Sequence, residues 1–151
     1  MPYDRLSPNS GISSRRLSLL TDLAQNASSK YIILTTVNAA TQRIPNRLVL
    51  SSATFQAEVG QRIDLDQLYS FFSKMGFSKN STVSEPGDYA VRGGIIDIFP
   101  PGEAGPIRLD LFGDILDGVR QFDPITQRTV SKMRDIKLAP ASEVFLDETS
   151  I

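Results

Sequence analysis

Apolar residues recur at two different spacings along this chain, and the change of spacing divides it into two parts. From Ser13 to Ala27, leucine and alanine follow a three- and four-residue repeat, which predicts an amphipathic helix. Tyr31–Thr36 (YIILTT) is a continuous apolar run rich in β-formers, typical of a strand buried on both faces. A short helix over Val37–Ile44, ended by Pro45, completes a helix–strand–helix order that is typical of an α/β domain.

From Arg47 onward the apolar runs become short and are separated by turns. Residues 47–60 are expected to form one long strand or two short ones. A helix follows, with Asp64 as its N-cap, Gln67 three residues later as in a capping box, and Gly76 as its stop. Its predicted apolar stripe consists of Leu65, Leu68, Phe72 and Met75.

The rest of the chain reads as strands separated by turns rich in proline, glycine and aspartate. The expected strands are Ser81–Ser84, Tyr89–Phe99, Ile107–Phe112, Ile115–Phe122 and Lys132–Leu138. The predicted fold class is therefore α+β: an antiparallel β-meander with one packed helix, preceded by a truncated α/β remnant. The predicted domain organisation is a truncated α/β part over 1–46, the α+β domain over 47–140, and a linker or tail over 141–151.

Two of these strands place charged side chains and an aromatic ring on one face. Alternation along Ile107–Phe112 turns the aliphatic side chains to the core, and Arg108, Asp110 and Phe112 outward. Along Tyr89–Phe99, unbroken alternation would turn Asp97 inward, which is costly. A β-bulge at Gly93–Gly94 is therefore predicted, because it would bring Arg92 and Asp97 to the same outward face.

This charged and aromatic face has three possible interpretations. The simplest is a solvated sheet face with cross-strand ion pairs and one exposed ring. The second is a protein-binding face, because arginine and aromatic side chains concentrate binding energy at interfaces. The third is nucleic-acid binding through base stacking on Phe112 and Arg108, although a net charge of −1 provides no broad basic surface.

Composition limits the chemistry available to the chain. Its 151 residues include no cysteine and no histidine, which excludes disulfides, zinc–thiolate sites and histidine-based triads. Neither nucleotide-binding glycine motif occurs, and the acidic residues lack the spacing of a metal-binding loop. We therefore expect no catalytic residue, cofactor or metal in this chain. No apolar run reaches the roughly 18 residues of a membrane span, and the N-terminus does not resemble a signal peptide, so a cytoplasmic location is expected.

Three segments carry a family resemblance. GDYAVRGGIIDIFPPG (87–102), IRLDLFGD (107–114) and VRQFDPITQRT (119–129) resemble the transcription-repair coupling factor family, Mfd. PYDRLSP and ILTTVNAATQRIP are similar to the region just before these segments in that family. The excision-repair protein UvrB shares the hairpin and is the nearest alternative.

The resemblance implies a domain like domain 2 of UvrB, inserted in a helicase-like α/β domain, that binds UvrA through Arg92, Arg108 and Phe112. It implies a role in transcription-coupled nucleotide excision repair of DNA damage. Full-length members would be ATP-binding hydrolases that use ATP and Mg²⁺ to translocate on DNA like helicases. They would contact RNA polymerase and DNA through regions absent from this chain. The alternative function is a UvrB-like or other nucleic-acid-binding module that uses the same hairpin face.

Overall fold

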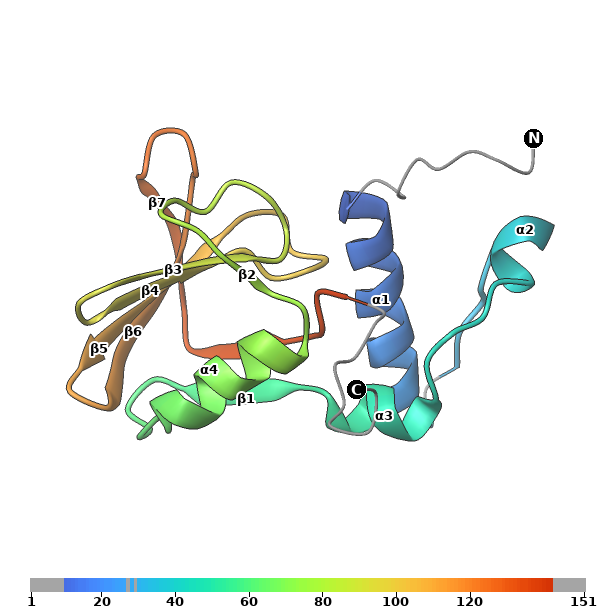
Figure 1. The fold of residues 1–151 in the computed structure, drawn as a ribbon, viewed down its shortest axis with the longest axis horizontal. Coiled ribbons are helices and arrows are strands. Elements are labelled where there is room, and N and C mark those ends of the chain that lie inside the picture. The colour runs from blue at the N-terminus through green and yellow to red at the C-terminus, as the bar shows by residue number, and fades with distance from the viewer. Residues whose placement is uncertain (1–9, 27, 29, 143–151) are drawn as a thin grey trace.

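The computed structural model describes residues 10–26, 28 and 30–142. Figure 1 shows a helical N-terminal part on one side and two β-sheets with a further helix on the other. The helices of the N-terminal part are α1 (Ser10–Gln25), α2 (Val37–Ala40) and α3 (Arg47–Ser52). The predicted helix over Ser13–Ala27 is thus present as α1.

The N-terminal part has a small core of its own. Leu17 and Ala24 of α1 pack against Leu50 of α3, and all three are buried. The predicted buried strand at Tyr31–Thr36 was wrong, because this segment is irregular and Ile32 and Leu34 are 95% and 94% exposed. A strand needs a neighbour for its backbone hydrogen bonds, and within the described residues no strand pairs with this segment. The proposal that residues 1–46 are a helicase-like remnant stays a prediction.

The segment after Pro45 contains both a helix and a strand. Residues 47–52 were expected to be extended, but they form α3, and only β1 (Phe55–Glu58) is a strand. Asn46 caps α3, since its side-chain oxygen accepts a hydrogen bond from the amide of Leu48 at 2.8 Å. The cap, together with the packing of Leu50 on α1, outweighs the weak β-preference of the sequence.

The second part is built on a six-stranded sheet. In order across the sheet, its strands are β2 (Ser78–Lys79), β3 (Asp88–Arg92), β4 (Ile95–Ile98), β5 (Ile107–Phe112), β6 (Ile115–Phe122) and β7 (Thr129–Met133). All neighbours pair antiparallel except β2 with β3, which confirms the α+β meander. Two expectations were wrong in detail: Ser81–Ser84 is not a strand, and 132–138 divides between two sheets. The last strand, β8 (Asp135–Leu138), pairs with β1 in a separate two-stranded sheet.

Gly93 and Gly94 form a tight hairpin turn between β3 and β4, so the predicted bulge within one long strand was wrong. Arg92 pairs with Ile95 across the turn, and Gly93 has a φ of 60°. Arg92 and Asp97 still lie on one face of the sheet, as predicted. Arg92 shares a face with its partner Ile95, and Asp97 lies two residues after Ile95 on the same strand. Register shifts occur instead farther along, in the β5–β6 and β6–β7 pairs.

The core lies between the six-stranded sheet, the β1–β8 pair and α4 (Leu65–Lys74). Asp64 caps α4 as predicted, because its carboxylate accepts from the amide of Gln67 at 3.0 Å. Gly76 follows the end of the helix with a φ of 77°. The predicted stripe faces the core, where the ring of Phe72 stacks on Tyr89 with centroids 4.3 Å apart. The side chains with at most 2% exposure here are Leu68, Phe72, Ile96, Ile98, Leu109, Leu116, Val119, Ile136 and Leu138.

The two turn glycines should respond differently to substitution. A Cβ at Gly94 would lie 2.7 Å from the carbonyl oxygen of Leu111, so Gly94→Ala must displace backbone and is expected to cost about 1–3 kcal/mol. Gly93 has open space around it, so a substitution there meets only the strain of its positive φ, which asparagine tolerates better than most residues; Gly93→Asn should therefore cost less than Gly94→Ala, at about 1 kcal/mol. Urea denaturation of both variants measures these costs. Equal costs would contradict the close approach of β4 to β5 at Gly94.

Candidate protein-binding face

The side of the six-stranded sheet away from the core carries the predicted site residues. Asp97 pairs with Arg108, and Arg108 pairs with Arg120, so these three side chains form a row across β4, β5 and β6. A second row, from β3 to β5, joins Arg92, Ile95 and Asp110. We call the following set the outer face: Arg92, Ile95, Asp97, Arg108, Asp110, Phe112 and Arg120.

Asp97 is the centre of this face, and it is buried. Its side chain is 2% exposed, although the sequence predicted an outward carboxylate, which the simplest interpretation of this face leaves solvated. Arg108 donates to it twice, from Nε to Oδ1 at 2.6 Å and from Nη2 to Oδ2 at 2.9 Å. Arg92 donates from Nη2 to Oδ2 at 2.5 Å. The carboxylate therefore points outward as predicted, but the two arginines cover it.

Arg108 is held from several directions, and its side chain is only 19% exposed. Besides Asp97, it donates to the side-chain oxygen of Gln127 at 2.9 Å. Its guanidinium also lies 4.6 Å from the centroid of the Phe122 ring. The hydrogen bonds to Asp97 raise the pKa of Arg108 further above its ordinary value, although burial opposes this. Arg108 is thus a fixed cation that stays partly exposed to solvent.

Of the three residues predicted to contact a partner, Arg92 and Phe112 are the most exposed. The side chain of Arg92 is 53% exposed and Phe112 is 80% exposed. The register shift near Phe112 does not turn its ring inward, because the extra residue, Asp117, lies on β6 and β5 keeps its alternation. Phe112 pairs with Ile115, which is 44% exposed, beside the turn that joins β5 to β6. A ring and a guanidinium are thus both available for contact on the outer face.

Three residues of this region were missed by the sequence reasoning. Arg120 donates to Asp110 at 2.7 Å, Phe122 lies under Arg108, and Gln127 holds Arg108 from a loop. Alternation along the predicted strand Ile115–Phe122 could have placed Arg120 and Phe122 on one face, whereas Gln127 carries no sequence signal. With Arg120 included, three arginines outnumber two carboxylates on the outer face, so it is locally positive although the whole chain is not.

The loop that carries Gln127 is organised by Asp123. Its carboxylate accepts from the amides of Ile125 and Thr126 at 2.9 and 2.7 Å, and from the Thr126 hydroxyl at 3.0 Å. The bonds from Thr126 hold the pKa of Asp123 below its ordinary value. Gln127 itself has a φ of 59°, which is uncommon outside glycine.

The loop should therefore respond to acid. Because the folded pKa of Asp123 is depressed, its contribution to stability is present above the unfolded pKa and is lost as pH falls through the folded value. We expect NMR titration of the carboxyl carbon to give a pKa below the ordinary value of about 3.9. Thr126→Val, which removes the hydroxyl but keeps the branched side chain, should raise the pKa of Asp123 part of the way toward its ordinary value. An unshifted pKa for Asp123 in the unmodified chain would contradict this organisation of the loop.

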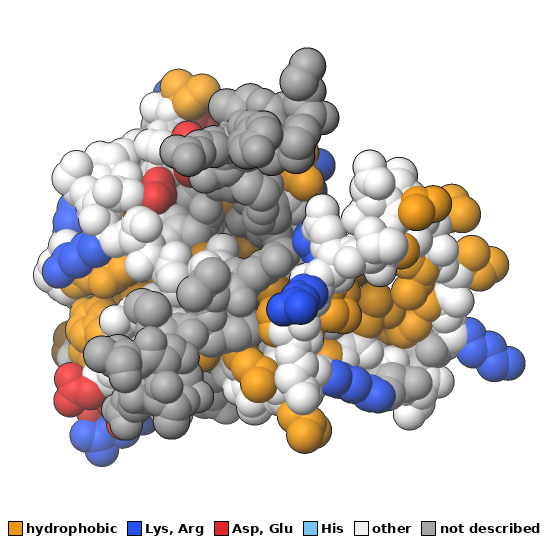
Figure 2. Space-filling model, turned by 45° about the vertical axis from the view of Figure 1, so that its right-hand side comes forward, with side chains coloured by type: hydrophobic (Ala, Val, Ile, Leu, Met, Phe, Trp, Pro, Cys, Tyr) orange, Lys and Arg blue, Asp and Glu red, His pale blue; other side chains and the backbone are white. Residues whose placement is uncertain are grey.

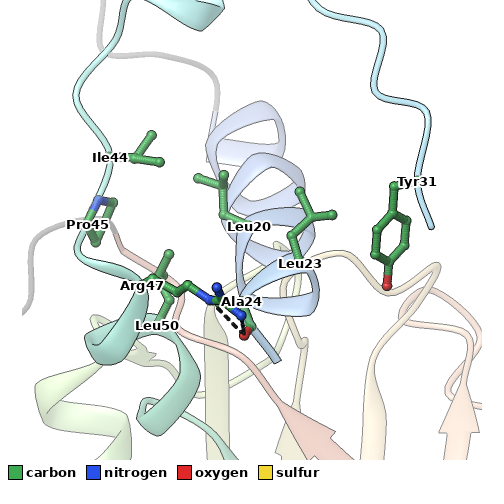
Figure 3. Close-up of a pocket in the computed structure, with 8 residues that line it drawn as sticks. All are labelled: Leu20, Leu23, Ala24, Tyr31, Ile44, Pro45, Arg47 and Leu50. Carbon is green, nitrogen blue, oxygen red and sulfur yellow. Dashed lines mark hydrogen bonds between the residues drawn. The ribbon is translucent and has the colours of Figure 1, made fainter. Parts of the chain in front are cut away.

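The helical part carries a separate apolar hollow of about 370 Å³. It is lined by side chains of α1 and α3 and by Tyr31, Ile44 and Pro45 (Figure 3). Its one charged residue, Arg47, donates to the backbone oxygen of Ala24 at 3.4 Å. Hydrophobic side chains gather on this side of the molecule in Figure 2. None of the predicted site residues lines it, so the outer face remains the candidate site.

Two further properties of the described part of the chain bear on function. Within residues 10–26, 28 and 30–142, no group of three or more acidic side chains is arranged to hold a metal ion. No described helix combines the length and apolar character needed to cross a membrane.

Comparison with known proteins identifies the family. Residues 55–144 match the family model of the UvrB interaction domain. The chain belongs to this family. The UvrB interaction domain match begins at the first residue of β1 and includes α4, both sheets and every residue of the outer face.

Several individual relatives of this UvrB interaction domain chain are transcription-repair coupling factors. The chain is 39% identical to that of Haemophilus influenzae over all 151 residues and 36% identical to that of Escherichia coli K12 over the same length. It is 35% identical to that of Myxococcus xanthus over 150 residues, which is 99% of the chain. The matched region spans 12–13% of the length of these relatives.

Proposed function

We propose that the outer face of this UvrB interaction domain binds UvrA and thereby recruits nucleotide excision repair. The observation that carries the proposal is the joint presentation of two guanidinium groups and a ring that is 80% exposed. Aromatic residues and arginine are enriched at protein interfaces, and arginine is also enriched among their hot spots. Residue by residue, the resemblance to transcription-repair coupling factors selects Arg92, Arg108 and Phe112.

The face also indicates what the partner surface should offer. Nη1 of Arg92 and Nη1 of Arg108 make no hydrogen bond within the described residues, so each has donors left for a partner. Such donors suit carboxylates, with which arginine forms strong charge-assisted bonds. Phe112 and Ile115 need an apolar hollow beside those carboxylates. A partner patch that combines acidic side chains with a hydrophobic pocket fits this face.

We further propose that the chain acts in the cytoplasm as part of a transcription-repair coupling factor. In that protein, ATP hydrolysis with Mg²⁺, translocation on DNA and contact with RNA polymerase would fall to residues outside this chain. The relatives support this assignment, because the chain matches only 12–13% of their length. The chain by itself would be a recruitment module with no enzymatic activity.

Nucleic-acid binding is the second candidate, favoured by the excess of arginine over carboxylate on the outer face. The two functions differ in their dependence on salt. Phosphate contacts release counterions, so affinity for DNA or RNA falls steeply as salt rises, whereas a mixed arginine and phenylalanine protein interface responds more weakly.

The test is a calorimetric titration of the chain with purified UvrA, and separately with a DNA duplex and a single strand, at low and physiological salt. Saturable UvrA binding that persists at physiological salt is the expected result. Binding only to nucleic acid, abolished by salt, would favour the second candidate. Binding to none of these partners would leave the outer face as a solvated surface.

A further inference from the structure

Asp97 occupies a position that a solvated ion pair does not explain. It lies on β4, between β3, which carries Arg92, and β5, which carries Arg108. Both of its carboxylate oxygens accept bonds from these two side chains, and its own exposure is 2%. The Asp97 carboxylate cannot contact a partner, because the side chains of Arg92 and Arg108 cover it.

The two arginines depend on Asp97 to different degrees. Arg108 has additional supports in Gln127 and in the ring of Phe122, so its guanidinium would keep two of its three anchors without the carboxylate. Arg92 makes no other side-chain hydrogen bond within the described residues, and its side chain is 53% exposed. A long side chain of this kind would otherwise sample many rotamers and would lose that freedom on binding. The direction of Arg92 therefore depends on Asp97.

We propose that Asp97 is a positioning residue of the partner-binding face, which orients Arg92 before the partner arrives. The inference rests on the proposed function, because it concerns the same face. Asp97 holds the Arg92 guanidinium next to that of Arg108, since both donate to the same carboxylate oxygen, and it contributes to affinity without touching the partner. As a second effect, the Arg92 side chain loses its rotamer freedom during folding, so this entropy is not lost again when the partner binds.

The experiment uses Asp97→Asn, which keeps the shape and one acceptor oxygen but removes the charge. UvrA titrations are made on the unmodified chain, Asp97→Asn, Arg92→Ala and the double variant, with a thermal melt of each. We expect each single substitution to weaken binding about tenfold, and the double variant to be little weaker than either single variant. Non-additivity is the decisive readout, because a purely structural carboxylate would not make the effect of Arg92→Ala disappear.

Two results of these titrations would overturn the positioning role by itself. One is a folded Asp97→Asn variant that binds UvrA normally while Phe112→Ala binds weakly, which leaves the proposed function intact and removes only the positioning role. The other is multiplicative loss in the double variant. If Phe112→Ala also binds normally, the proposed function fails and this inference fails with it.

A measurement on the unmodified chain covers the case in which Asp97→Asn does not fold. Nitrogen-15 relaxation of the Arg92 Nε–H group reports whether this side chain is ordered without a partner. An ordered Arg92 is expected, comparable with Arg108. A freely moving Arg92 in the unbound chain would overturn the proposal.

Discussion

Phe112→Ala is expected to weaken UvrA binding by roughly 2 kcal/mol or more, about 30-fold, while the free energy of unfolding changes by less than about 0.5 kcal/mol. The ring is 80% exposed and leaves no core cavity when it is removed. Its loss removes only an apolar anchor of the outer face. Isothermal titration with UvrA and urea denaturation of the same preparation measure the two quantities.

Leu109→Ala is the matched control on the same strand. Leu109 is fully buried on the opposite face of β5, so this substitution should cost about 2–5 kcal/mol of stability. If Phe112→Ala were destabilised like Leu109→Ala, the ring would belong to the core. If it stayed folded and bound UvrA normally, the outer face would be a solvated surface with ion pairs.

Arg108→Ala should be the most destabilising substitution on the outer face, at about 3 kcal/mol. An outward side chain on a sheet can ordinarily be truncated at little cost. Arg108 differs because its removal takes two of the three hydrogen bonds from Asp97, a carboxylate that is 2% exposed. It also uncovers the ring of Phe122. Urea denaturation gives the change in unfolding free energy.

Two companion variants test that explanation. Arg92→Ala should cost less than about 1 kcal/mol, since the side chain is 53% exposed and leaves Asp97 paired with Arg108. Asp97→Ala combined with Arg108→Ala should be more stable than Arg108→Ala alone, because no buried charge is left without a partner. A double variant less stable than the single one would show that the cost of Arg108→Ala is not the buried charge of Asp97.

These stabilities affect how binding data on the face are interpreted. A loss of UvrA binding in Arg108→Ala combines a lost contact with disturbance of Asp97 and, through it, of Arg92. Phe112→Ala and Arg92→Ala report the contact more directly, because their side chains are more exposed. Of the three predicted contact residues, Arg108 is therefore the least informative when mutated alone.

Local sequence was sufficient for features whose partners lie within a few residues. The cap at Asp64, the stop at Gly76 and the apolar stripe of α4 were predicted correctly, since each depends on contacts one helical turn away. Alternation along β5 likewise put Arg108 and Phe112 on one face, because the pleat of a strand depends on its own backbone.

At Gly93–Gly94, the local sequence pattern did not decide between two backbone conformations. A bulge and a two-residue turn both put Arg92 and Asp97 on one face, so the pattern of charges could not distinguish them. The Gly-Gly pair between alternating strands is itself a hairpin signal, and β3 and β4 pair across it. The outward orientation of Arg92 and Asp97 was therefore predicted correctly, although the β-bulge predicted to produce it was wrong.

The remaining features were decided by residues far apart in the sequence. Whether Tyr31–Thr36 becomes a strand depends on a pairing edge, and no strand among the described residues pairs with it, so its aliphatic side chains stay exposed. The burial of Asp97 depends on the register that sets β4 between β3 and β5, and on a loop that brings Gln127 to Arg108. The sequence by itself determined which residues point outward. Only the tertiary structure decided which of them are covered, because burial is a property of the neighbours that a side chain meets.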